Sequence, residues 1–140
     1  MKTSAIASKE STRSVRSVAP GARRITLRET STASALEQAK KALGQEGLAV
    51  LDVIDLRDAM ERRTDQDIGP YFLVQFFQPE LASRELAVDG AAGLGVRHEI
   101  GIWQEGKDAI VASLRASAAQ EAVPESIENR IANVMGRLAI

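Results

Sequence analysis

The sequence contains no cysteine among its 140 residues, and only one histidine and one tryptophan. The absence of cysteine excludes disulfides, thiolate nucleophiles, iron–sulfur clusters and cysteine-type zinc sites. No apolar run approaches the roughly 18 residues that a transmembrane helix needs, and the N-terminus lacks the apolar core of a secretory signal. We therefore expect a cytoplasmic protein without membrane insertion.

Charge is divided unevenly between a basic N-terminal segment and an acidic remainder. Residues 1–24 contain six Lys or Arg and one Glu, which leaves 12 basic and 18 acidic residues in the other 116. The length fits one domain with a real core, and 44% hydrophobic with 26% charged residues is typical of a globular protein. We therefore divide the chain into a basic N-terminal arm, residues 1–22, and a single domain, residues 23–140.

The N-terminal arm is rich in Ser and Thr and has no aromatic residue. On its own it should be disordered, because it buries too little apolar surface to offset the entropy of ordering it. Arginines in and beside the arm can contact an acidic protein partner: Arg13, Arg16, Arg23 and Arg24. A solubilising extension is an equally simple interpretation. Nucleic acid binding is disfavoured, because the rest of the chain is acidic and the arm offers no aromatic ring for stacking.

Hydrophobic periodicity predicts alternating strands and helices in the remainder of the chain. The predicted strands are residues 25–29, 48–54, 71–77, 96–104 and 109–114. The first predicted helix follows an N-cap at Ser31 or Ser34 and ends at Gly47, and the second is a short helix over 55–63. The third runs from Pro79 to the Asp89-Gly90 break, and the fourth is C-terminal and carries Ile127 and Leu138.

This order, β-α-β-α-β-α-β-β-α, predicts an α+β fold with two layers. We expect a mixed sheet of about five strands with the helices packed on one face. The other face of such a sheet stays available, and a second copy of the chain is the usual way to cover it. The sequence therefore predicts a homodimer.

Four short motifs resemble those of the domain of unknown function 302 family, in the family's order and spacing over roughly residues 24–118. They are GLAVLDVIDL from Gly47 to Leu56, DIGPY from Asp67 to Tyr71, QPELA from Gln78 to Ala82, and Gly93-Leu94. The resemblance implies a small α+β fold, commonly dimeric, whose biochemical activity is not established.

The chain departs from the family pattern at its polar and nucleophilic positions. Phe77-Gln78-Pro79 stands where the family has Cys-Asn-Pro, and Arg97-His98 stands where it has Pro-Cys. The strand hydrophobics, the glycines and the helix-starting proline are kept. We interpret the chain as a diverged member that retains the scaffold and has lost any thiol-dependent chemistry, because phenylalanine offers neither a lone pair nor a proton.

The positions of the missing cysteines suggest a ligand pocket formed by His98, Gln78, Arg97 and Phe77. Imidazole titrates near neutral pH and can act as a base or ligand, and a glutamine at a helix start can orient a polar ligand. The competing interpretation is structural: a partly buried histidine with a hydrogen-bonding neighbour, and a glutamine that caps a helix. Trp103 alternates onto the face opposite Ile102, where a subunit interface would use it.

Two functional hypotheses follow. The first is a non-catalytic binding or assembly protein, a dimeric scaffold whose basic arm docks on a protein partner within a larger complex. The alternative is a small-molecule or metal-binding domain with a pocket near His98. No Ser-His-Asp order, HExxH or P-loop pattern occurs, so we assign no catalytic residue, no metal ligand and no cofactor, and an enzymatic role is not favoured.

Overall fold

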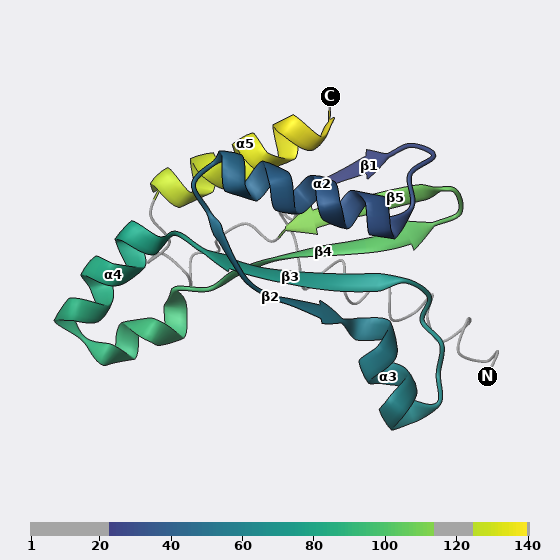
Figure 1. The fold of residues 1–140 in the computed structure, drawn as a ribbon, viewed down its shortest axis with the longest axis horizontal. Coiled ribbons are helices and arrows are strands. Elements are labelled where there is room, and N and C mark those ends of the chain that lie inside the picture. Colours follow the sequence, from purple (N-terminus) through teal and green to yellow (C-terminus); the bar gives the residue numbers. More distant parts are fainter. Residues whose placement is uncertain (1–22, 114–124, 140) are drawn as a thin grey trace.

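The chain folds into five strands, four helices and one 3-10 helix within residues 23–113 and 125–139, the parts that the computed structural model describes (Figure 1). The strands are β1 (Arg23–Leu27), β2 (Ala49–Asp55), β3 (Tyr71–Phe77), β4 (His98–Glu105) and β5 (Asp108–Ser113). The helices are α2 (Thr32–Gln45), α3 (Leu56–Thr64), α4 (Pro79–Val88), the 3-10 helix η1 (Gly90–Gly95) and α5 (Glu125–Ala139). The expected order of elements is confirmed, with η1 as an addition.

The strands form one sheet in the order β1-β5-β4-β3-β2, in which every pair of neighbours is antiparallel. The α+β class is confirmed, but the expectation of a mixed sheet is wrong. Asp55 at the end of β2 pairs with Phe72 near the start of β3, so the chain re-enters the sheet at the end where it left. A parallel neighbour would need a crossover that carries the chain back to the opposite end.

Helices α2 and α5 cover one face of the sheet, and the hydrophobic core lies between them and the strands (Figure 1). The largest fully buried side chains include Phe76, Ile100 and Ile102 of the strands and Leu43 of α2. In contrast, α3 and α4 project beyond opposite ends of the strands (Figure 1); α3 has no buried residue and α4 has only Ala82. The expectation of helices packed on one face therefore holds for α2 and α5 alone.

Local signals set the ends of α2 and join it to α5. Ser31 is the N-cap, and its Oγ accepts a hydrogen bond from the backbone N–H of Ser34 at 3.0 Å. Gly47 follows the helix with a φ of +74°, and a Cβ there would lie 2.8 Å from Arg130 Nη1. That nitrogen donates to the carbonyl oxygen of Glu46 at 2.8 Å. The glycine therefore permits both the turn and the contact with α5.

Gln104 of β4 joins the β1–α2 turn to the β4–β5 hairpin. Its Nε2 donates to the carbonyl oxygens of Thr30 at 3.0 Å and Asp108 at 2.9 Å. Its Oε1 accepts from the backbone N–H and the hydroxyl of Thr32 at 2.8 and 2.6 Å. Thr32 is 2% exposed, so water does not replace these bonds. One amide thus satisfies polar groups of three segments.

We expect Gln104→Leu to lower the free energy of unfolding by about 2 kcal/mol or more, because each buried polar group left without a partner costs about 1–3 kcal/mol. Urea unfolding followed by circular dichroism measures the loss. Gln38→Leu, on the exposed side of α2, is the matched control and should change stability by less than about 0.5 kcal/mol. Equal effects of the two substitutions would contradict the structural role of Gln104.

Candidate functional site

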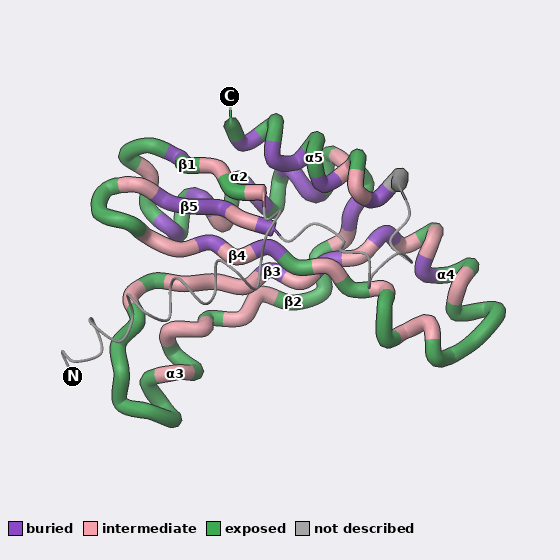
Figure 2. The backbone as a smooth tube through the Cα atoms, turned by 180° about the vertical axis from the view of Figure 1, so that it is seen from behind, coloured by how far each residue is buried: buried purple, intermediate pink, exposed green. Residues whose placement is uncertain are grey.

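The face of the sheet turned away from α2 and α5, which we call the open face, carries apolar side chains that are only partly buried. Strand alternation puts Leu73 and Trp103 there, because their neighbours Val74 and Ile102 face the core. Figure 2 views the sheet from this side. The open face is formed by Arg24, Asp52, Ile54, Tyr71, Leu73, Gln75, Phe77, Glu99, Gly101 and Trp103. Ile110 of β5 points to the same side, but its side chain is fully buried.

Tyr71 of β3 and Trp103 of β4 form a stacked aromatic pair on the open face. Their ring centroids lie 5.3 Å apart, with 13° between the ring planes. Gly101 provides the space, because a Cβ at that position would lie 3.1 Å from Tyr71 Oη. Burial, and secondly the charge of Glu99, raises the pKa of the Tyr71 hydroxyl. The tyrosine therefore remains a neutral hydrogen-bonding group at physiological pH.

Charged residues hold the tryptophan in place. The guanidinium carbon of Arg24 lies 5.6 Å from the Trp103 ring centroid, within the range of a cation–π contact. Glu105 accepts a hydrogen bond from Trp103 Nε1 at 2.9 Å and another from Arg24 Nη2 at 3.2 Å. Arg24 and Glu105 are about half exposed, so the pair contributes little to stability and serves mainly to orient the ring.

The residues of the expected pocket lie on two sides of the sheet. His98 faces the helix side, where its ring lies 5.8 Å from the ring of Phe76, and Gln78 is buried at the start of α4. Phe77 alternates onto the open face, and Arg97 is exposed. The structure therefore does not bring His98, Gln78, Arg97 and Phe77 together around one cavity. Gln78 is the N-cap of α4 but makes no side-chain capping bond.

His98 is half-buried, and its burial lowers the pKa of the imidazole below the ordinary value of 6.5. The negative charges of Glu128 on α5 and Glu85 on α4 act in the opposite direction but are the smaller causes. A neutral imidazole near pH 7 follows from this environment.

The arginines assigned to the basic arm divide into two groups. Arg13 and Arg16 lie outside the described residues. Arg23 and Arg24 belong to β1, where Arg23 pairs with Glu128 and Arg24 with Glu105. The residues that can act as a separate arm therefore carry four basic residues and one acidic residue within 1–22.

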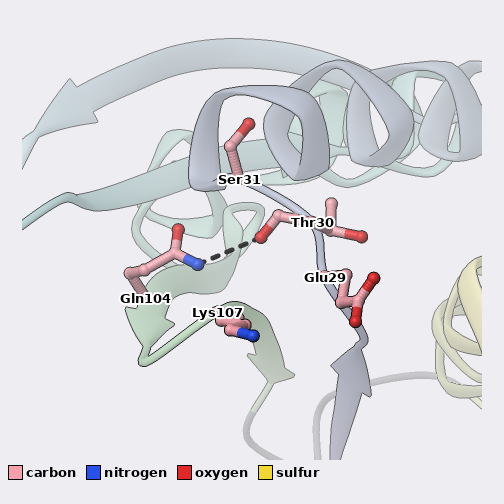
Figure 3. A pocket seen from close by; sticks show the side chains of 5 residues that line it. All are labelled: Glu29, Thr30, Ser31, Gln104 and Lys107. Carbon is pink, nitrogen blue, oxygen red and sulfur yellow. Dashed lines mark hydrogen bonds between the residues drawn. The ribbon is translucent and has the colours of Figure 1, made fainter.

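A surface hollow of about 440 Å³ lies at the hairpin end of the domain (Figure 3). Its lining comes from the β1–α2 turn and the β4–β5 hairpin: Glu29, Thr30, Ser31, Gln104 and Lys107. The amide of Gln104 already has its hydrogen-bonding partners in the fold, and Ser31 caps α2. Because these polar groups already make hydrogen bonds within the fold, they have little remaining hydrogen-bonding capacity for a ligand in the hollow.

Within residues 23–113 and 125–139, no group of three or more histidine and carboxylate side chains could hold a metal ion. In the same part of the chain, no helix has both the length and the apolar character needed to cross a bilayer.

These features define a class of protein, a small α+β domain built on an antiparallel sheet with one helix-covered face. The model of the family described as Domain of unknown function DUF302 matches residues 24–139, and the chain belongs to this family. The motif resemblance is thus confirmed, and the match extends to the end of α5. Among curated proteins, no significant match was found.

A solved structure with the same fold is the crystal structure of the uncharacterized conserved protein DUF302 from Bacillus stearothermophilus. It superposes with a TM-score of 0.71 over 86% of this chain and 99% of that one, at 18% sequence identity. At this identity the likeness shows the fold alone.

The sequence interpretation placed Trp103 on the correct face but did not recognise the open face as a unit. The sequence pattern places Tyr71 and Leu73 only within the predicted strand 71–77 and assigns them to neither face. Side chains alternate between the two faces along β3, so Phe72, Val74 and Phe76 share one face and Tyr71 and Leu73 share the other. Once Val74 or Phe76 is known to be in the core, alternation assigns Tyr71 and Leu73 to the open face.

We expect the wild-type protein to lose stability relative to a His98→Gln variant as the pH falls from about 7.5 to about 5.5. The lowered pKa means that the unfolded chain binds more protons than the folded one just below pH 6.5, so folding becomes less favourable there. Melting temperatures of both proteins across this range provide the test. Parallel curves for the two would show that burial of His98 does not favour the neutral imidazole.

Proposed function

We propose that the protein is a non-catalytic assembly protein that forms a homodimer through the open face and uses its basic N-terminal arm to dock on an acidic protein partner. One observation carries the dimer: a sheet face with a stacked aromatic pair and half-buried aliphatic residues that α2 and α5 do not cover. A second sheet packed on this face at about 10 Å would give each side chain a partner, as in a β-sandwich.

The composition of the open face supports a protein interface over a cofactor pocket. Tyrosine and tryptophan are enriched at interfaces because each joins a large apolar body to one polar group. Tyr71 and Trp103 provide that centre, with Leu73 beside them. Polar residues lie farther along the same face, where Gln75 Nε2 donates to Glu99 Oε2 at 3.2 Å. An apolar centre with a polar margin is the usual anatomy of an interface.

The charges on the open face favour a second copy of the same chain. Arg24 lies on β1 at one edge of the sheet, and Asp52 lies on β2 at the other. A two-fold axis parallel to the strands, running over β4 in the space between the two sheets, would place each β1 over the partner's β2. That operation brings opposite charges toward one another at both ends of the interface, as an isologous dimer requires.

The non-catalytic part of the proposal rests on the distribution of chemical groups. The chain has no cysteine, and its only histidine lies on the helix-covered face, away from Phe77 and Arg97. A nucleophile and a base have to lie within hydrogen-bonding reach of one another to cooperate. The residues at the family's distinctive positions do not meet this condition as a set.

We expect Leu73→Lys to convert the dimer into a monomer, because it would bury an unpaired charge in the centre of the interface. Light scattering should then give the chain mass of 15.1 kDa in place of twice that value. Val88→Lys on α4, a position that is 87% exposed and away from the open face, is the matched control and should stay dimeric. A monomeric wild type, or a dimeric and folded Leu73→Lys protein, would refute the proposed interface.

We expect a chain that begins at Arg23 to remain dimeric and to lose its protein partner. A full-length variant with Arg13→Glu and Arg16→Glu should behave in the same way, because it keeps the length of the arm and removes its charge. Pull-down from native lysate with mass measurement of each bait is the test. Equal recovery of the same partner by all three proteins would show that the arm does not dock it.

A further inference from the structure

A second surface hollow, of about 230 Å³, lies between α2 and α5, the two helices that cover the sheet (Figure 1). Drug-sized ligands usually occupy pockets of about 300–1,000 Å³, so this hollow suits a smaller molecule. The described side chains that line it include two cations and no carboxylate: Gln38, Lys41, Ala42, Gln45, Arg137 and Leu138. We call this place the interhelix hollow.

Arg137 is fixed at the interhelix hollow by hydrogen bonds to the end of α2. Its Nε donates to Glu46 Oε2 at 2.8 Å, and its Nη1 donates to Gln45 Oε1 at 3.2 Å. Above all, the hydrogen bond from Arg137 lowers the pKa of the Glu46 carboxyl, so this carboxylate is ionised at neutral pH and balances the charge of Arg137. Within the described parts of the chain, Nη2 of the oriented guanidinium makes no hydrogen bond.

Lys41 adds a positive charge that the fold does not balance. Its ammonium group forms no ion pair or hydrogen bond within residues 23–113 and 125–139, whereas the ammonium of Lys40 pairs with Glu37 at 3.2 Å. Lys41 is not needed to cap α2, because backbone N–H groups just beyond the helix already donate to its last carbonyl oxygens. One unbalanced cation favours an anion that carries a single charge.

The interhelix hollow also has an apolar floor. Ala42 of α2 and Leu138 of α5 line it, and both belong to the hydrophobic core. A hydrocarbon group placed on this floor leaves water, which is favourable by about 25 cal/mol per Å² of apolar surface. Sulfate gains nothing from such a surface, and only one of its two charges would meet an unbalanced cation.

We propose that the interhelix hollow binds a small monocarboxylic acid. The carboxylate accepts hydrogen bonds from Lys41 and Arg137, and the hydrocarbon part lies on the apolar floor. The open face lies on the other side of the sheet from α2 and α5. The acid-binding proposal therefore depends neither on the dimer nor on the N-terminal arm.

Isovalerate is a suitable probe, because it joins a carboxylate to a short branched hydrocarbon. Acetate has the same carboxylate with little hydrocarbon, and isovaleramide is the uncharged counterpart of isovalerate. We expect isovalerate, added to isotope-labelled full-length protein at constant ionic strength, to shift the NMR signals of the backbone N–H groups of Ala42 and Leu138 saturably. Acetate, sulfate and isovaleramide should each bind more weakly.

Two lysine variants separate the site from the general charge of α2. Lys41→Gln should weaken isovalerate binding by up to about fivefold, the range that an exposed ion pair provides. Lys40→Gln is the matched control, because Lys40 is also exposed on α2 but does not line the hollow, and this variant should bind as the wild type does.

Three results would count against the proposal. Equal weakening by the two lysine substitutions, or none by Lys41→Gln, would overturn the assignment of Lys41. Binding of isovaleramide or sulfate at least as tight as that of isovalerate would overturn the ligand class. The absence of a saturable shift with every probe would overturn the site itself.

Discussion

The rest of the structure depends on the burial of one face of an antiparallel sheet under two helices. Phe76, Ile100 and Ile102 reach the core only because strand alternation directs every second side chain toward α2 and α5. The same alternation directs Leu73 and Trp103 away from it. Because the helices occupy one side, the domain gains its hydrophobic stabilisation there and leaves a second, partly exposed apolar surface on the other face.

The elements could be predicted from the sequence, whereas their contacts could not. Local signals such as the Ser31 cap and the left-handed Gly47 act over a few residues, so the ends of a helix can be predicted from a single sequence. Strand direction depends on how α3 returns the chain. The Arg23–Glu128 pair joins residues 105 apart in sequence, and no periodicity reports a contact of that kind. The pocket residues are separated for a related reason, because Phe77 and Phe76 are neighbours on β3 and point to opposite faces, and His98 lies on the face of Phe76.

The separation of the predicted pocket residues bears on the two positions at which the family pattern has cysteine. Phe77 and His98 stand at the two positions where the motif resemblance expects cysteines, yet one is on the open face and the other on the helix side. In this chain the two side chains therefore point to opposite faces of the sheet. Phe77 adds apolar area to the proposed interface, and His98 packs against Phe76.

The central claim is that the open face is covered by a second copy of the chain, and Trp103 is well placed to report on it. It is the only tryptophan in the protein and lies on that face. The decisive measurement is the fluorescence of full-length protein during serial dilution, alongside sedimentation equilibrium. The account predicts that tryptophan emission shifts to longer wavelength over the same concentrations at which the mass falls to 15.1 kDa. A mass of one chain at every concentration, or dissociation that leaves the emission unchanged, would contradict it.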